Sequence, residues 1–375
     1  MVPIDVCVRG GGAVGRTLAL LLAGLRLRVG LVAKPRFDAA TRPDVRCYAL
    51  NLSSRRLLES LRAWPEGPAV TAVSKMRIQG DDQGRVHFDA AEQGVTALAW
   101  IVEAAALEEQ LAQATAFQPL VETLEEPAFA PLTVICEGQA SATRDRMGID
   151  FDRIPYRQVA VATRISCERA HEATARQWFD HGEVLAFLPI QGKTGNSAAV
   201  VWSVNMERQA ELESLDDAGL AHALEQASHG ALGGLELCGP RSSWPLQLGK
   251  ATHWTGKSTN DPLIASWALA GDAAHQVHPL AGQGLSLGLA DVADLASILG
   301  ARDYWRGVGD LRLLRRYERQ RKLAMAPLAW TMDGIQRSFA LGQGTWRELR
   351  NAGMNGFDRM GPLKAWVVAQ ATGQA

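Results

Sequence analysis

The sequence predicts an α/β fold, in which helices cover a mostly parallel sheet, with an inserted β-sheet domain and C-terminal helices. Three observations predict it. Residues 4–32 combine two β-rich runs with a glycine cluster and an apolar helical segment, and residues 156–165 and 184–204 are rich in alternating β-formers. The chain beyond Asp310 has helical spacing. With 375 residues, 47% of them hydrophobic, the chain can bury a large core.

Residues 4–32 predict a strand, a helix and a second strand. The β-rich runs "IDVCV" and "RVGLV" enclose the apolar segment "RTLALLLAGL". Gly10, Gly12 and Gly15 have dinucleotide-fingerprint spacing: the first allows the turn, the second lets backbone approach a pyrophosphate, and the third lets helix pack on strand. Free N–H groups at the helix start would face the phosphates. The unit is therefore Rossmann-like.

Two positions of this unit depart from the usual pattern. Arg9 replaces an apolar strand residue, so we expect it either near phosphate or pointing to solvent. Ala33 and Lys34 follow the second strand, where an acid usually holds ribose hydroxyls. The ribose must then be held in another way.

The middle of the chain predicts further strands and a helix. Lys75–Ala91 alternates around "GDDQG", as a hairpin does, and "AWIVEAAALEEQLAQA" predicts a strand end followed by a helix. "PLTVICEG" is a buried strand run ending at Glu137 and Gly138, and "LIASWALA" leads into Gly271 and Asp272.

Composition excludes several classes of protein. The net charge of −1 gives no global field that would favour nucleic acid, so we expect no nucleic-acid partner. The five cysteines are an odd number without a C-x-x-C pair, which favours a reducing cytoplasm over disulfides or zinc. No apolar run reaches the ~20 residues of a membrane-spanning helix. We expect a cytoplasmic protein that is at most peripheral to the inner membrane.

The late segment "GDAAHQVHPLAGQGLSLGLADVADL" predicts a helix that begins near Gly282. Its apolar residues, continued just beyond the segment, recur at helical spacing and would bury one face: Leu285, Leu289, Val292 and Leu299. Pro279, Gly282 and Gly284 leave backbone N–H groups and the positive helix end open to a flat, electron-rich ring. Asp272, at a strand end, can accept hydrogen bonds from a polyol chain.

These motifs resemble those of a known family. The glycine fingerprint, "EG" after a middle strand and "GDAAHQVHPLAGQGLSLG" are similar to the three FAD motifs of the aromatic-ring flavin monooxygenases, the relatives of para-hydroxybenzoate hydroxylase. "DVRCYALNLSSRRLLESLRAW", "HFDAAEQGVTALAWIVE" and "LRNAGMNGFDRMGPLKAW" resemble the ubiquinone-biosynthesis hydroxylases in particular. The similarity covers nearly the whole chain.

The resemblance implies a single-component enzyme that uses FAD, NAD(P)H and O₂ to hydroxylate a phenolic ring, with a polyprenylated ubiquinone precursor as the expected substrate. Another phenolic substrate is one alternative. A non-catalytic paralogue that serves as an assembly partner in a biosynthetic complex is the other. Departures from the family pattern favour this last alternative, and the intact late motif opposes it.

The resemblance also assigns site residues by motif position. Gly10, Gly12 and Gly15 would hold the pyrophosphate, Gly271 and Asp272 the ribityl and phosphate region, and Arg46 of "DVR" the side of FAD. The residues assigned to the reacting edge of the isoalloxazine are Pro279, Gly282, Gln283 and Gly284, with Leu285 beside them. No metal ligand and no catalytic base are assigned.

Four departures from the family pattern predict loose FAD binding with unchanged placement. Glu137 stands where the family has Asp, Ser286 where it has Asn, and Ala33 where it has the ribose acid. "VEAAAL" lacks the Asn-Arg that commonly follows the Glu. We expect Ser286 on the helix surface or facing the flavin.

Two further features have alternative interpretations. His275 and His278 are three residues apart, but without a clustered third ligand we expect a packed, satisfied His275 and a hydrogen-bonding His278 beside the flavin. The basic stretch "RLLRRYERQRK" is either a helix that meets a membrane surface or a partner, or a solvated helix face. Aromatic residues in 329–346 are candidates for the same contact.

The expected domains are discontinuous. Residues 1–74, 98–150 and 254–310 form the FAD-binding domain, residues 75–97 and 151–253 form a β-sheet substrate domain that roofs the pocket, and residues 311–375 form a C-terminal helical region.

Overall fold

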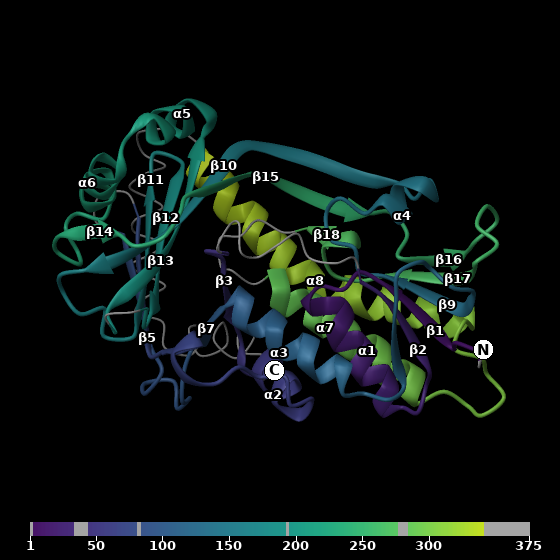
Figure 1. Ribbon diagram of the computed structural model, residues 1–375. Helices are drawn as coiled ribbons and strands as arrows, with labels where there is room; N and C mark the ends of the chain where they lie inside the picture. The colour runs from purple at the N-terminus through teal and green to yellow at the C-terminus, as the bar shows by residue number, and fades with distance from the viewer. Residues whose placement is uncertain (1–2, 34–43, 81–83, 193–194, 277–283, 341–375) are drawn as a thin grey trace.

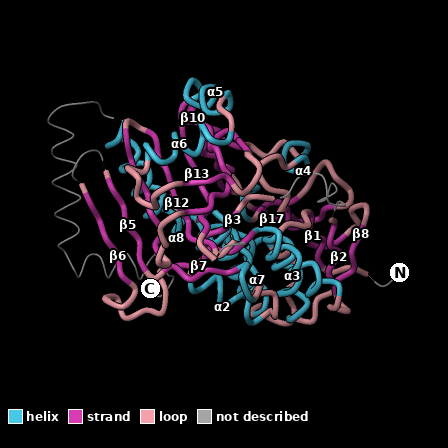
Figure 2. The backbone as a smooth tube through the Cα atoms, turned by 60° about the vertical axis from the view of Figure 1, so that its left-hand side comes forward, coloured by secondary structure: helices cyan, strands magenta, loops and turns pink. Residues whose placement is uncertain are grey.

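The computed structural model describes residues 3–33, 44–80, 84–192, 195–276 and 284–340. Two large sheets, a small third sheet and the helices around them make up this part of the chain (Figure 1). Figure 2 separates the two large sheets, with β5 and β6 at one side of the molecule and β1, β2 and β8 at the other. Within the described residues, no helix has both the length and the apolar character needed to cross a bilayer.

The first large sheet has six strands in the order β16-β17-β9-β1-β2-β8. All of its neighbours are parallel except the pair β16 and β17. Its strands are β1 (Val6–Arg9), β2 (Val29–Val32), β8 (Val121–Leu124), β9 (Ala130–Ile135), β16 (Thr255–Lys257) and β17 (Ile264–Leu269). The predicted strand–helix–strand unit is confirmed, with α1 (Ala13–Gly24) between β1 and β2.

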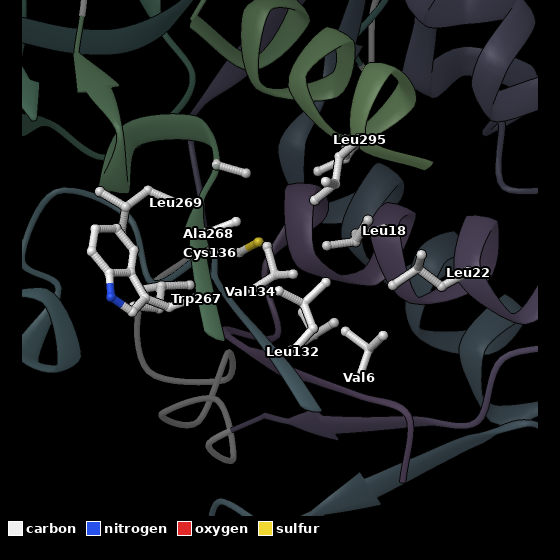
Figure 3. Packing of buried hydrophobic residues seen from close by; sticks show 14 of the residues in the cluster. Val6, Leu18, Leu22, Leu132, Val134, Cys136, Trp267, Ala268, Leu269 and Leu295 are labelled. Carbon is white, nitrogen blue, oxygen red and sulfur yellow. The ribbon is translucent and has the colours of Figure 1, made fainter. Parts of the chain in front are cut away.

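Apolar side chains from helices and strands form the core beneath this sheet. Val6 and Val134 on the strands pack against Leu18 and Leu22 of α1 and Leu295 of α7 (Gly284–Gly300), as Figure 3 shows. Each of these side chains is fully buried. This packing holds α1 and α7 against the same face of the sheet.

The second large sheet contains nine strands. Its main order is β18-β15-β10-β13-β12-β11-β5-β6, with β14 paired to β10. The strands are β5 (Lys75–Gln79), β6 (Arg85–Asp89), β10 (Phe151–Cys167), β11 (Thr174–Asp180), β12 (Glu183–Ile190), β13 (Ser197–Asn205), β14 (Leu235–Leu237), β15 (Ser242–Ala251) and β18 (His275–Gln276). The predicted hairpin is confirmed as the antiparallel pair β5 and β6.

Two helices that the sequence analysis did not predict cover one face of this sheet. They are α5 (Met206–Ser214) and α6 (Asp217–Ala227). Each begins after a capping side chain, because Asn205 accepts from the backbone N–H of Arg208 and Asp216 from that of Gly219. Residues of α6 pack into a cluster with strand residues such as Trp202.

A three-stranded sheet lies between the second large sheet and the helices. Its order is β3 (Cys47–Leu50), β7 (Ala99–Glu103) and β4 (Val70–Val73), and β7 leads directly into α3 (Ala104–Ala116), as predicted. Val73 and Ile101 pack against strands of the nine-stranded sheet. On the other face, Trp100 packs with Leu58 of α2 (Leu52–Ser60) and with α3.

Short elements complete the described chain. They are the 3₁₀ turns η1 (Gly67–Ala69) and η2 (Gly271–Ala273), and the helix α4 (Ala142–Arg146). The helical pattern predicted beyond Asp310 is confirmed by α8 (Leu311–Ala340), which packs on α7 and β16.

Candidate FAD site

Three sequence motifs meet at one edge of the six-stranded sheet. Arg9, Ile135 and Leu269 are partners in register and end their parallel strands. The backbone N–H of Cys136 donates to Arg9 O at 2.7 Å, and that of Ala270 donates to Ile135 O at 3.1 Å. The turns that follow β1, β9 and β17 therefore lie side by side, at the carboxyl edge where open α/β sheets bind ligands.

The start of α1 is open and lacks a side-chain cap. Its N-cap, Gly12, has extended backbone and makes no capping bond through a side chain. A Cβ added at Gly12 would meet nothing within 4 Å, so space lies in front of the helix. Gly10 has φ +122°, and a Cβ on Gly15 would overlap the carbonyl oxygen of Gly10. The predicted roles of Gly10 and Gly15 in the turn and in the packing agree with this geometry.

A tight contact joins α1, η2 and α7 behind this opening. Gly271, with φ +62°, lies against Val14 of α1. A Cβ on Gly288 would be 2.8 Å from Val14 Cγ2 and 3.2 Å from Gly271 Cα. Glycine at position 288 thus allows α7 to pack closely against α1 and η2.

Asp272 lies in η2, between these elements. Its carboxylate is half-buried and makes no hydrogen bond or ion pair with any described residue. Burial raises the pKa of Asp272; the nearby charge of His275 acts in the opposite direction, and that of Asp291 acts in the same direction. An unpaired carboxylate at this place is an acceptor for hydroxyl donors.

A fully buried acid of α7 holds the turn that carries Asp272. Oδ2 of Asp291 accepts from the backbone N–H of Gly271 at 2.9 Å and lies 2.6 Å from His275 Nε2. Its Oδ1 accepts from Arg321 Nε at 2.7 Å. Burial alone would raise the pKa of Asp291, but the charges and hydrogen bonds of His275 and Arg321 outweigh burial and lower it.

Helix α8 extends this network to the strand before the turn. Arg321 Nη1 also donates to Asp294 Oδ2 at 3.1 Å. Tyr317 donates through its hydroxyl to the carbonyl of Leu269 at 2.8 Å. The ring of His275 stacks on Trp254, with centroids 4.9 Å apart. The expectation that His275 is packed and satisfied is confirmed.

Sequence reasoning missed Asp291, Tyr317 and Arg321. A signal was present, because Asp291 lies next to Val292 on the apolar stripe of α7, and Arg321 continues the buried stripe of Leu314 and Tyr317 on α8. Opposite charges at two core positions indicate a buried pair.

Glu137 follows β9 and Arg9 ends β1, and both side chains contact α4. Glu137 accepts from the hydroxyls of Ser141 at 2.8 Å and Thr143 at 2.6 Å, and from the backbone N–H of Thr143 at 2.9 Å. Arg9 is 2% exposed, and its Nη1 donates to Thr143 Oγ1 at 3.3 Å. Its Nη2 lies 3.5 Å from an Asp261 oxygen. The expectation that Arg9 points to solvent is wrong, because the guanidinium is buried against an acid.

The remaining predicted site residues have different surroundings. Arg46 donates from Nε and Nη2 to Asp44 at 2.9 and 2.7 Å and is 48% exposed. Ala33 lies against Gly11, where an added Cβ would be 2.5 Å from Ala33 Cβ. That close approach accounts for the small side chain at the end of β2.

The late motif is described only in part. Gly284 begins α7, and Leu285 packs against the cluster that includes α2. Ser286 is buried and its Oγ accepts from Asn51 N at 3.5 Å, so the expectation of a helix-surface hydroxyl is wrong. Pro279, Gly282 and Gln283, together with His278, lie outside the described residues.

Comparison with known proteins shows the family. A family model described as "FAD binding domain" matches residues 78–330. The 3-demethoxyubiquinol 3-hydroxylase of Escherichia coli is 30% identical to this chain, and the alignment covers 99% of each protein. This chain belongs to the FAD-dependent aromatic monooxygenases. Within that family it groups with the ubiquinone hydroxylases, since UbiL of Rhodospirillum rubrum is also 29% identical over 98% of this chain and 89% of the relative.

Solved structures of other flavin monooxygenases have the same fold. The p-nitrophenol 4-monooxygenase PnpA of Pseudomonas putida has a TM-score of 0.73, with 17% identity over the whole of both chains. PqsL of Pseudomonas aeruginosa, a probable FAD-dependent monooxygenase, has a TM-score of 0.71 with 20% identity, covering 94% of this chain and 99% of that one.

The described residues of this monooxygenase fit the cofactor of its family. The uncapped start of α1 offers backbone N–H donors to a pyrophosphate, and the space in front of Gly12 admits one. The carboxylate of Asp272, which pairs with none of the described residues, suits the hydroxyls of a ribityl chain. The carboxylate of Glu137 accepts hydrogen bonds from the start of α4.

Proposed function

We propose that this protein hydroxylates the phenolic ring of a polyprenylated ubiquinone precursor, with NAD(P)H as reductant and O₂ as co-substrate. The observation that carries the proposal is the 30% identity with 3-demethoxyubiquinol 3-hydroxylase over 99% of both chains. Identity along the whole length includes the segments that would hold cofactor and those that would enclose substrate.

FAD, when bound, supplies the redox chemistry with O₂. Gly10, Gly12 and Gly15 let the start of α1 approach the pyrophosphate, and Asp272 accepts from the ribityl hydroxyls. Asp291 holds Gly271, and so holds Asp272 at its place. We propose Arg46 as a contact at the side of FAD; for this the arginine must exchange its bond with Asp44.

The reacting edge of the ring would lie at the start of α7. We propose Pro279, Gly282, Gln283, Gly284 and Leu285 for this edge, where free N–H groups and the positive helix end stabilise negative charge. The nine-stranded sheet would exclude water from this edge. In this proposal, residues 1–74, 98–150 and 254–310 bind FAD, and residues 75–97 and 151–253 enclose the substrate.

A visible spectrum and a quinone analysis test the proposed function. We expect purified protein, supplied with FAD, to show flavin bands that NADH or NADPH bleaches. Deleting the gene should cause a quinone precursor lacking one ring hydroxyl to accumulate, and the missing hydroxyl identifies the carbon that is modified. A bleached flavin with an unchanged quinone pool would reject the ubiquinone precursor in favour of another phenol.

A further inference from the structure

The first part of α8 has two faces of opposite character. Leu314, Tyr317 and Arg321 are buried against α7 and the six-stranded sheet. With about 100° per residue, the opposite side of the helix carries Arg312, Arg316, Arg319 and Leu323, with Arg315 at its edge. All five side chains are exposed. We call Arg312, Arg315, Arg316 and Arg319 the basic face.

The acids of this segment form their ion pairs with basic residues outside the basic face. Between Arg302 and Lys322 the acids are Asp303, Asp310 and Glu318. Arg306 pairs with Asp303 and Asp310, and Lys322 with Glu318. Within the described part of the chain, none of the four arginines of the basic face forms an ion pair. An ordinary solvated helix face interleaves charges of both signs.

Two aromatic side chains stand exposed in the turn before α8. Tyr304 is 96% exposed and Trp305 is 66% exposed, and their rings meet edge to face at 4.9 Å. Leu323, on the same side of α8 as the basic face, is 74% exposed. Exposed Tyr and Trp combined with arginine are typical of protein segments at the headgroup level of a bilayer.

We propose that the basic face docks this protein flat on an anionic lipid surface, with Tyr304 and Trp305 entering the headgroup layer. Charge complementarity carries this choice of occupant. Four guanidinium groups that form no ion pair with any described residue match lipid phosphates, whereas the net charge of −1 gives the whole molecule no attraction of its own. The benefit of docking rests on the proposed function, since a polyprenylated substrate partitions into the bilayer.

Flotation of the full-length, FAD-loaded protein with vesicles tests the docking. We expect binding to phosphatidylcholine vesicles that contain phosphatidylglycerol, weak binding to phosphatidylcholine alone, and release by salt. Each basic residue near such a surface strengthens binding about fivefold. The variant R312Q/R316Q/R319Q should therefore bind about 100-fold more weakly, and W305A several-fold more weakly. Glutamine keeps the helix propensity of arginine.

A control variant removes the same charge elsewhere. R56Q/R77Q/R169Q changes exposed arginines outside α8 and should bind vesicles like the unchanged protein. Equal binding by the two triple variants overturns the proposal. So does a basic face that retains duplex DNA or an acidic polypeptide but not the anionic vesicles.

A second readout separates the docking from the proposed function. NADH- or NADPH-dependent hydroxylation of a short-chain phenol in detergent solution reports on the site alone, and it should be the same in R312Q/R316Q/R319Q and the unchanged protein. Loss of vesicle binding with hydroxylation intact in both proteins supports the docking. Hydroxylation without any vesicle binding by the unchanged protein overturns the docking and leaves the proposed function standing.

Discussion

Asp272 and Asp291 are two acids of one site with opposite electrostatic surroundings. Asp272 has no described hydrogen-bond partner, and burial raises its pKa. Asp291 accepts from the backbone N–H of Gly271 and contacts an imidazole and a guanidinium. Burial would raise its pKa, but His275 and Arg321 together lower it. The first environment is typical of a group that awaits a ligand, and the second of a group that holds structure.

Replacing Asp272 should separate cofactor binding from stability. In Asp272→Ala, FAD binding should weaken about 10- to 100-fold, because a charge-assisted hydrogen bond to the ribityl chain is lost. The free energy of unfolding without FAD should stay the same or rise, because a raised carboxyl pKa means that the ionised group costs stability. Quenching of flavin fluorescence and urea unfolding measure the two effects.

Asp152→Ala, on the exposed part of β10, is the matched control and should change neither quantity. If Asp272→Ala binds FAD as tightly as the control does, Asp272 has no role in holding the ribityl chain.

Replacing Asp291 should mainly lower the free energy of unfolding. Asp291→Asn leaves the buried Arg321 and His275 without their shared anion, and breaking a buried pair costs about 3 kcal/mol or more. Asp294→Asn removes the more exposed partner of Arg321 and should cost less than about 1 kcal/mol. Urea unfolding of both variants measures the difference. Equal losses of stability in Asp291→Asn and Asp294→Asn would show that the bonds of Asp291 do not hold the turn at Gly271.

At the scale of elements, glycines decide how closely the motifs approach each other. Gly15 is needed for packing, since a Cβ there would overlap the carbonyl of Gly10, whereas Gly12 faces open space. The fingerprint therefore contains two glycines that the fold requires, Gly10 and Gly15, and one, Gly12, that only a ligand would require.

Gly12→Ala should impair FAD binding, whereas Gly15→Ala should reduce the stability of the fold. Gly12→Ala should unfold within about 0.5 kcal/mol of the unchanged protein, as a substitution into open space does. Its FAD binding should weaken more than tenfold, because the Cβ occupies the approach of the pyrophosphate. Gly15→Ala should lose about 1–3 kcal/mol of stability through overpacking. Thermal unfolding and FAD titration distinguish the two, and normal FAD binding by Gly12→Ala would contradict a pyrophosphate at this place.

The sequence predicted the helix that has a clear local signal, α3, but not the helices α5 and α6. The segment after β7 was predicted because its strand end runs directly into a helix-forming sequence, and α3 begins at Ala104. Helices α5 and α6 were not predicted, because the alternating β-formers that precede them favoured a sheet for this part of the chain. Their capping residues Asn205 and Asp216 were the available signals.

At the scale of the whole molecule, charged groups on α7 and α8 connect folding to pH. Asp291 and Glu318 both have lowered pKa values, Asp291 through His275 and Arg321 against burial, and Glu318 through Lys322 and Thr255 against burial. A carboxyl with a lowered folded pKa contributes stability that is complete above its unfolded pKa. That stability is lost as pH falls through the folded value.

Stability should therefore fall on acidification below about pH 4, near the unfolded pKa of a carboxyl. In Asp291→Asn part of this dependence disappears, so its melting temperature should change less between neutral and acid pH. Calorimetry across this range measures both slopes. A variant with the same slope as the unchanged protein would show that Asp291 is not paired in the folded state.

The sequence by itself determined the strand–glycine–helix unit, the helix of the late motif and the membership of the family. These features are encoded within a few neighbouring residues, through side-chain periodicity and the backbone freedom of glycine. Only the tertiary structure decided the partners of the buried charges. Arg9 meets Asp261, Glu137 caps α4, and Asp291 meets Arg321 thirty positions further along the chain. A buried charge is stable only with a desolvated partner, and packing of distant segments selects that partner.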